Sequence, residues 1–177
     1  MNSLTEDAIE QNLIALLKKQ GYQYLRGNEL KRSFDEPVLE GTFKAALKRL
    51  NPNLPESVRA AGFQHVLYLG AGDVMSNNEK FHQMMIDGVT TEYFKKGESI
   101  GLQIRLIDFD KPENNDFLVV NQFIIRENNQ SKRLDLVLFV NGLPLVVIEL
   151  KSALRDFTRN KLRNFGFNKH IPFGQCV

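Results

Sequence analysis

The chain has 177 residues, of which 42% are hydrophobic and 25% are charged, as is ordinary for one soluble globular domain. Its net charge of +2 is nearly neutral, so nucleic acid binding would need a local basic patch. One cysteine, Cys176, excludes an internal disulfide framework and fits a reducing compartment. The sequence shows neither an apolar signal segment nor an apolar run long enough for a membrane span, so we expect a cytoplasmic protein with no membrane partner.

A first helix is predicted over residues 5–20. Ser3 or Thr5 can cap it, Ser3-x-x-Glu6 fits a capping box, and Gly21 follows its C-terminus. The helical period predicts a buried stripe of Ile9, Leu13, Ile14, Leu16 and Leu17. Glu6 and Glu10 fall on the same side, and a capping role is favoured for Glu6. A buried carboxylate needs a partner or a metal, so Glu10 is a candidate for either a structural hydrogen bond or a site role.

The middle of the chain is predicted to be a short strand over 21–25 and then three helices. The helices span 42–50, from Pro55 to about Leu69, and up to Asp87, the last one capped by Ser76-x-x-Glu79 and closed by Gly88. Their basic residues are interpreted as a solvated face, with phosphate contacts as the alternative; they are Lys44, Lys48, Arg49 and Arg59.

From Val89 the apolar period changes from helical to extended. Alternation predicts a half-buried strand over 99–108, and a second strand is predicted over 117–126. A closing helix is predicted over 152–165. Helix, strand, helical insertion, a mostly antiparallel run of strands and a final helix together predict a mixed α/β domain.

Two apolar runs, 134–140 and 145–150, flank Asn141-Gly142 and predict a hairpin whose strands are buried on both faces. Only three ionisable residues interrupt it: Asp135, Glu149 and Lys151.

The spacing of these three residues decides whether they meet. Glu149 and Lys151 are two positions apart and share a face, about 7 Å from each other along the strand. Asp135 shares that face only if the connection has an odd number of residues or contains a bulge, because a regular two-residue loop places Asp135 opposite Ile148. We therefore predict an odd or bulged connection, with two carboxylates and one ammonium converging near the centre of a sheet.

Two carboxylates at such a short distance repel each other by about 4 kcal/mol at an effective dielectric constant of about 20. This repulsion predicts a cation between them. Carboxylate oxygens suit Mg²⁺. The pattern therefore predicts metal-assisted phosphodiester hydrolysis, with Lys151 positioning the water or stabilising developing charge. The alternative is that Glu149 and Lys151 form a solvated strand end and that Asp135 is a turn residue.

Two longer stretches carry a family resemblance. Asn121-Gln122-Phe123 and the stretch from Arg133-x-Asp135 to Glu149-Leu-Lys151-Ser resemble the N-terminal nuclease domain of type I restriction enzyme R subunits, in the PD-(D/E)xK nuclease superfamily. The resemblance runs upstream through 106–110 and 114–117 and covers about residues 5–165. It implies a restriction-endonuclease-like mixed sheet flanked by helices. The chain would be a single nuclease domain over 1–177, with a helical insertion at about 42–88 and the catalytic hairpin at 132–151.

The same resemblance implies roles for particular residues. Asp135 and Glu149 would be Mg²⁺ ligands, Lys151 the catalytic lysine, and Glu10 a further metal ligand. The implied substrate is double-stranded DNA, and the implied partners are the methylation and specificity subunits of a type I complex. ATP would be used only by translocase domains of the intact subunit, since this chain has no G-x-x-x-x-G-K-[ST] motif.

The chain departs from the family pattern in three places. Leu134 replaces a proline that is not a ligand. Lys161 and Phe165 stand where the family has Gln-x-x-x-Tyr; Lys161 is a candidate contact to a DNA phosphate, with a surface lysine as the alternative. The residues after Phe165 match poorly, and further strands are expected beyond Val177.

The prediction is a Mg²⁺-dependent endonuclease domain of a type I restriction system. One alternative is a catalytically inactive fragment acting as a DNA-binding or subunit-docking module. Another is a nuclease of the same superfamily in repair or mobile-element defence.

Overall fold

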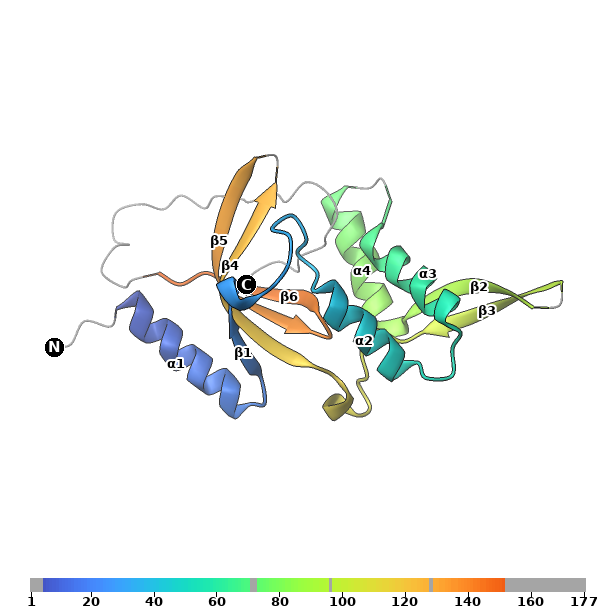
Figure 1. Cartoon of the computed structure of the whole chain (residues 1–177), viewed down its shortest axis with the longest axis horizontal. Coiled ribbons are helices and arrows are strands. Elements are labelled where there is room, and N and C mark those ends of the chain that lie inside the picture. Colours follow the sequence, from blue (N-terminus) through green and yellow to red (C-terminus); the bar gives the residue numbers. More distant parts are fainter. Residues whose placement is uncertain (1–4, 71–72, 96, 128, 152–177) are drawn as a thin grey trace.

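Two β-sheets form the framework of the computed structural model, which describes residues 5–70, 73–95, 97–127 and 129–151 (Figure 1). The larger sheet has the strand order β1 (Gln23–Arg26), β4 (Phe117–Glu127), β5 (Gln130–Val140) and β6 (Leu143–Ile148). Strand β1 runs parallel to β4, and the other pairs are antiparallel. The smaller sheet is the hairpin of β2 (Val89–Lys95) and β3 (Glu98–Ile104). The predicted mixed α/β fold is confirmed.

Four α-helices accompany the sheets: α1 (Glu6–Lys19), α2 (Glu40–Leu50), α3 (Glu56–Leu67) and α4 (Val74–Asp87). Two short 3₁₀ helices, η1 (Gly27–Glu29) and η2 (Pro112–Asn114), precede α2 and β4. The three helices expected between the first strand and the extended half of the chain are confirmed. No helix among the described residues has the length and apolar character needed to cross a bilayer.

The expected cap of α4 is wrong by three positions. Asp73 is the N-cap residue, and its carboxylate accepts hydrogen bonds from the Ser76 backbone N–H at 3.0 Å and the Ser76 hydroxyl at 2.8 Å. These bonds lower the pKa of the Asp73 carboxyl, with the Ser76 backbone N–H as the largest cause. Asp73 takes this place because a carboxylate both accepts the unpaired N–H groups of a first turn and complements the helix dipole.

Helix α1 covers one face of the larger sheet. Thr5 caps it by accepting a hydrogen bond from the Ala8 N–H at 3.2 Å. Its buried residues Ile14 and Leu17 pack against strand residues Val119, Leu136 and Leu138. Leu16, predicted to be buried, is 53% exposed. It is adjacent to Leu17 and therefore lies about 100° away around the helix.

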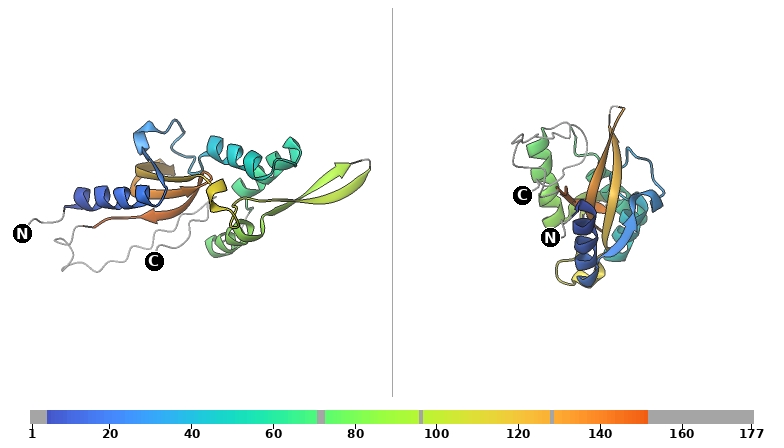
Figure 2. Two further views of the ribbon diagram at one scale, coloured as in Figure 1. Left: turned by 90° about the horizontal axis from the view of Figure 1, so that it is seen from below. Right: turned by 90° about the vertical axis from the view of Figure 1, so that its left-hand side faces the viewer.

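The other face of the sheet packs on the segment that leads from η1 to α2. This cluster consists of Leu39, Val120, Phe123, Ile125, Leu134, Val137 and Phe139. A third cluster joins α2, α3 and α4 to the β2–β3 hairpin and to Leu143 of β6. The outer end of the hairpin projects away from the larger sheet, with Phe94 70% exposed (Figures 1 and 2). The half-buried strand predicted over 99–108 ends earlier, at Ile104.

The β5–β6 turn is anchored where these clusters meet. Both turn residues are left-handed, Asn141 at φ +53° and Gly142 at φ +81°. The Gly142 carbonyl accepts a hydrogen bond from the Leu39 N–H at 2.9 Å. The fully buried Asn141 amide donates to the Leu106 carbonyl at 2.9 Å and to Asn115 Oδ1 at 2.8 Å. The hairpin that carries the predicted site residues is therefore fixed at its closed end.

Candidate functional site: a carboxylate pocket under helix α1

The hairpin connection confirms one prediction. Its loop has two residues, since Val140 pairs with Leu143, but a β-bulge shifts the register between Leu138 and Phe139. Leu136 therefore pairs with Ile148, and the same register places Asp135 across from Glu149. Beyond the end of β6, the Leu150 N–H donates to Asp135 Oδ2 at 2.7 Å. The bulge thus brings the end of the Glu-x-Lys strand alongside Asp135.

A second irregularity lies on the other side of Asp135. Strands β4 and β5 pair at Asn121 with Leu136 and then at Phe123 with Leu134, which leaves Gln122 and Asp135 unpaired between them. Gln122 has a left-handed backbone, with φ +51°. In a regular strand neighbouring side chains point to opposite faces. Here Asn121 and Gln122 both reach toward α1, and Phe123 packs on the opposite face against Phe139.

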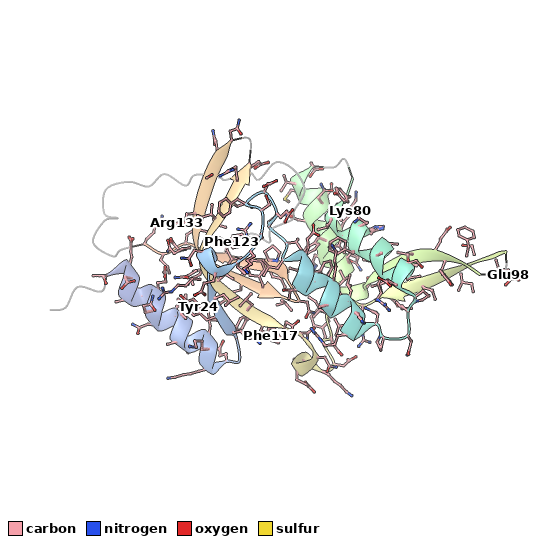
Figure 3. All side chains as sticks on the ribbon, in the orientation of Figure 1. Tyr24, Lys80, Glu98, Phe117, Phe123 and Arg133 are labelled. Carbon is pink, nitrogen blue, oxygen red and sulfur yellow. The ribbon has the colours of Figure 1, made fainter. Side chains whose placement is uncertain are left out.

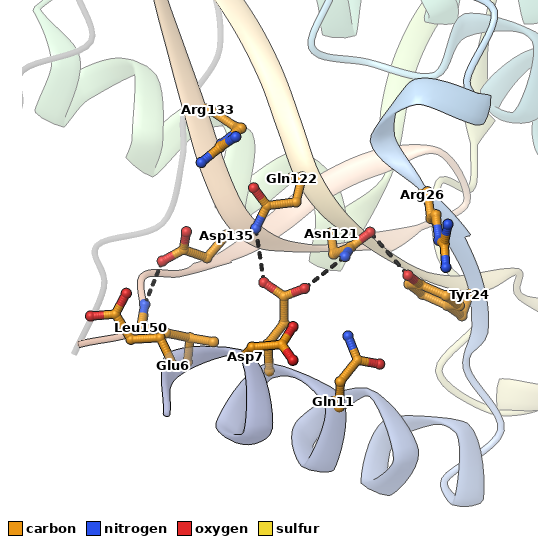
Figure 4. A pocket seen from close by; sticks show the side chains of 11 residues that line it. Glu6, Asp7, Gln11, Tyr24, Arg26, Asn121, Gln122, Arg133, Asp135 and Leu150 are labelled. Atoms are coloured by element: carbon orange, nitrogen blue, oxygen red, sulfur yellow. Dashed lines mark hydrogen bonds between the residues drawn. The ribbon is translucent and has the colours of Figure 1, made fainter. Parts of the chain in front are cut away.

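Both amides bind the same carboxylate. Glu10 of α1 is only 8% exposed; its Oε1 accepts from Asn121 Nδ2 at 2.7 Å, and its Oε2 accepts from Gln122 Nε2 at 2.9 Å. The Tyr24 hydroxyl donates to Asn121 Oδ1 at 3.1 Å, which fixes the orientation of that amide. The prediction that Glu10 lies on the buried side is confirmed, and its structural hydrogen bonds are present (Figure 4). Its role as a metal ligand stays a prediction.

Glu10 and Asp135 line one cavity of about 390 Å³ between α1 and the sheet. The remaining lining residues are Glu6, Asp7, Gln11, Tyr24, Arg26, Asn121, Gln122, Arg133 and Leu150. Four carboxylates and two guanidinium groups therefore share this space. Asp135 is half-buried, and no described residue donates a hydrogen bond to its second oxygen, Oδ1.

The structure does not bring all three predicted hairpin residues into this cavity. The Glu149 carboxylate lies 3.1 Å from the Lys132 ammonium, and Glu149 does not line the cavity. Lys151 is exposed and also lies outside the lining. Glu149 follows the last residue of β6, so strand pairing does not fix the direction of its side chain. Its carboxylate reaches Lys132 instead. Within the described ranges, no group of three or more His, Cys, Asp or Glu side chains is arranged to hold a metal.

One predicted site residue cannot be placed. Lys161, Phe165 and the closing helix expected over 152–165 lie outside the described residues. Other lining residues had no role assigned from the sequence: Tyr24, Arg26, Asn121, Gln122 and Arg133. One signal for two of them was available, because Asn121-Gln122 is a polar pair inside an otherwise apolar strand.

Comparison with known proteins places the chain in a family. The family model described as the N-terminus of the type I restriction enzyme R protein matches residues 3–173. The type I restriction enzyme HindI endonuclease subunit of Haemophilus influenzae is 38% identical over 168 residues, which is 86% of this chain and 15% of that protein. A protein of Methanocaldococcus jannaschii, provisionally named the type I restriction enzyme MjaIXP endonuclease subunit, is 34% identical over 177 residues, which is 94% of this chain and 17% of that protein.

This chain therefore spans less than a fifth of the length of each of these two relatives. The match nevertheless extends over almost all of this chain, including α1, the Asn121-Gln122 pair and the β5–β6 hairpin. The chain belongs to the family of type I restriction enzyme R protein N-terminal regions.

Proposed function

We propose that this chain is the Mg²⁺-dependent endonuclease domain of a type I restriction enzyme R subunit and that it cuts double-stranded DNA. The observation that carries the proposal is that Glu10 of α1 and Asp135 of β5 line one cavity. Two of the relatives are named type I restriction enzyme endonuclease subunits, which supports the nuclease assignment.

The donor chemistry of the cavity fits Mg²⁺. Its walls carry carboxylate and amide oxygens, which Mg²⁺ prefers, and it has no sulfur or imidazole. Asp135 Oδ1 is not hydrogen-bonded by any described residue, so that oxygen can bind a cation. Mg²⁺ usually keeps several bound waters, so one or two protein carboxylates are enough to bind the ion before Glu149 joins them. Asp135 would hold the ion, with Glu10 beside it and Glu149 joining after it leaves Lys132.

The chain's own residues orient this site. The Leu150 N–H holds Asp135 Oδ2, which leaves Oδ1 without a hydrogen bond from any described residue. The Asn121 and Gln122 amides fix the position of the Glu10 carboxylate by donating to both of its oxygens. Lys151 supplies a positive charge for the phosphate as negative charge develops on it. Bound Mg²⁺ would polarise the phosphate and lower the pKa of water. A water oxygen bonds to phosphorus as the P–O ester bond breaks, the water gives up one proton, and the leaving oxygen takes up one proton, so that one water is consumed for each bond cut.

The wider system is part of the same proposal. In the intact R subunit the cut would follow ATP-driven translocation by domains outside this chain. The methylation and specificity subunits would choose the DNA site. A domain of this kind needs no sequence readout of its own, because contacts to phosphates position a protein on DNA without reading its bases.

Calorimetric titration of Mg²⁺ or Mn²⁺ into the wild type and Asp135→Asn tests the proposal, followed by a plasmid-nicking assay. We expect binding and cutting by the wild type and loss of both in Asp135→Asn. Asp110→Asn is the matched control, because Asp110 is 83% exposed at its side chain and lies outside the cavity. Full cutting by Asp135→Asn would contradict the site assignment.

One observation favours a second candidate, a non-catalytic DNA-binding or subunit-docking module. Glu149, which a nuclease of this type needs as a ligand, is paired with Lys132. A wild type that binds DNA or partner subunits but takes up no Mg²⁺ or Mn²⁺, even with DNA present, would support this candidate over the nuclease.

A further inference from the structure

We propose that Arg26 and Arg133 form a phosphate-binding subsite that holds the DNA backbone over the cavity, next to the bond to be cut. This inference rests on the proposed nuclease function and assigns its substrate contacts. Both arginines line the cavity that contains Glu10 and Asp135. Both are exposed, and they belong to different strands, β1 and β5.

The first argument is that both charges are available. Four carboxylates line the same cavity, yet neither guanidinium forms an ion pair with any carboxylate of the described residues. Other arginines in the described structure are engaged: Arg49 pairs with Asp116 at 2.7 Å, and Arg105 pairs with Asp108 at 3.2 Å. Arg26 and Arg133 therefore keep their donors for a ligand, and a planar guanidinium matches the oxygens of a phosphate.

The second argument is electrostatic. The charged lining residues comprise four carboxylates and two arginines, so the cavity is net negative. A polyanion would be repelled from such a surface unless cations met its phosphates. One bound divalent cation would bring this sum to about zero, with the two arginines already counted. The arginines would then be the cationic side chains of the cavity that meet the phosphates of a DNA backbone.

The third argument is spacing. Arg26 pairs with Asn121 of β4, which pairs with Leu136 of β5, so the two arginines are separated by two strand spacings, about 10 Å. Arg133 is also three residues along β5 from Leu136, about a further 10 Å. The resulting diagonal of about 14 Å is longer than the axial rise of about 3.4 Å per nucleotide, so the two arginines would contact different phosphates of one strand.

Figure 4 shows how this diagonal relates to the carboxylates. Arg26 and Arg133 lie at opposite sides of the view, with Asn121 and Gln122 between them and Glu10's helix below. A strand held by both arginines would therefore pass over the cavity rather than end beside it. In that view Asp135 lies below Arg133, on the side away from Arg26, so the phosphate next to the Arg133 contact would be the one presented to Asp135.

Binding of a short fluorescein-labelled DNA duplex in EDTA, followed by anisotropy at several salt concentrations, tests this subsite without cutting. The variants are Arg26→Gln and Arg133→Gln in the full chain. Lys80→Gln is the matched control, since Lys80 is exposed on α4 and lies far from Arg133 (Figure 3). We expect each arginine variant to bind about tenfold more weakly at about 0.1 M salt and to lower the salt slope by about one.

The control should bind as the wild type does. Arg26→Lys and Arg133→Lys should restore the salt slope, because the charge returns, while affinity recovers only in part. Arginine variants that bind DNA with wild-type affinity and slope would overturn the subsite. A wild type that binds no duplex at low salt would overturn it too.

Asp135→Asn separates this inference from the nuclease proposal. It should stop cutting while keeping metal-free DNA binding, since it removes a negative charge and leaves both arginines. If the arginine variants bind normally while Asp135→Asn loses cutting, the subsite is wrong and the nuclease proposal stands. If the arginine variants lose binding while Asp135→Asn still cuts, the subsite stands and the metal assignment is wrong.

Discussion

Gln122 lies across from Asp135 at the position where β4 and β5 each leave one residue unpaired. Its left-handed backbone turns its side chain toward α1, where its amide binds Glu10. A non-glycine residue in this conformation costs on the order of 1–3 kcal/mol. A hydrogen bond to a charged carboxylate returns about the same amount, 1.5–3 kcal/mol. The placement of Glu10 and Asp135 is thus tied to one strained residue.

Substitutions at Gln122 should therefore reverse the usual order of strand preference. Gln122→Gly loses the hydrogen bond but relieves the backbone, so we expect a change in unfolding free energy within about 1 kcal/mol. Gln122→Val loses the bond and keeps the strain with a branched side chain, so we expect destabilisation by about 2–4 kcal/mol. Urea unfolding measures both variants.

The matched pair for this test is at Ser99 of β3, an exposed position with ordinary backbone. There Val should be more stable than Gly, because branched residues suit strands and glycine weakens them. If Gln122→Val unfolds with a higher free energy than Gln122→Gly, the left-handed backbone at residue 122 does not determine which side chains this position accepts.

Most of the fold was predictable because hydrophobic periodicity controls it. The stripe that buries Ile14 and Leu17 and the apolar runs of β5 and β6 both read directly as elements. The bulge was predictable as well, because Asp135 and Glu149 lie opposite each other across a two-residue loop only if the strand register shifts by one residue. Local spacing is sufficient information in each of these cases.

The details of the site depend on contacts that no local pattern encodes. The left-handed turn at Gln122 is matched by close contact of its carbonyl with Gly27 of η1, distant in sequence. Glu149 pairs with Lys132, a strand residue whose partner is set by the register and by where β6 ends. The two arginines reach the cavity from strands separated by more than 100 residues, so neither could be assigned before the fold was known.

Removing the Lys132 ammonium should strengthen metal binding. Lys132→Met leaves Glu149 without its cationic partner and so available to a metal at Asp135. An exposed ion pair is worth about 0.2–1 kcal/mol, so we expect Mg²⁺ affinity to rise by about 1.5- to 5-fold in calorimetry. Lys44→Met is the control, because Lys44 pairs with Glu40 on α2, away from the cavity. Weaker Mg²⁺ binding by Lys132→Met would mean that Lys132 supports the site instead of competing for Glu149.

Loss of the Lys151 ammonium should separate metal binding from cutting. Lys151→Ala should bind Mg²⁺ like the wild type, because Lys151 lies outside the cavity lining and an ammonium is no metal ligand. Its nicking rate should fall by about 100- to 1000-fold, the range for loss of one group that stabilises transition-state charge. Lys111→Ala, at an exposed lysine beside η2, should change neither quantity. Unchanged nicking by Lys151→Ala would remove Lys151 from the mechanism.

The β5–β6 turn should tolerate no side chain at Gly142. A Cβ there would lie 2.7 Å from the Leu39 carbonyl oxygen and 2.8 Å from the Phe43 nitrogen, both backbone atoms that cannot rotate away. Gly142→Ala should cost about 3 kcal/mol or more of unfolding free energy, since left-handed strain adds to the clash. Gly21→Ala is the control: φ is +97° but nothing lies within 4 Å, so only about 1–2 kcal/mol of strain applies. Equal losses at both positions in urea unfolding would show that contact with α2 does not hold the turn.

The Asp108 carboxyl should make the unfolding free energy of the protein depend on pH. Its pKa lies below the ordinary 3.8, chiefly because the Asn114 amide donates to it at 2.9 Å, with smaller contributions from the Lys111 N–H and the Arg105 charge. A carboxyl whose pKa is lower in the folded protein stabilises it fully above the unfolded value, and this stabilisation is lost as pH falls through the folded value.

Asp108→Asn should therefore lower the unfolding free energy at pH 7, and its difference from the wild type should shrink as the pH drops below about 3.8. The Asn115 side chain hydrogen-bonds to the Asp108 backbone and to the Asn141 amide. Loss of the Asp108 carboxylate should therefore also loosen the β5–β6 turn. Urea unfolding at a series of pH values measures the effect, with Asp110→Asn as the control for a lost exposed carboxylate. A difference that stays constant from pH 7 to pH 3 would mean that Asp108 stabilises the fold through its shape and neutral hydrogen bonds rather than through its charge.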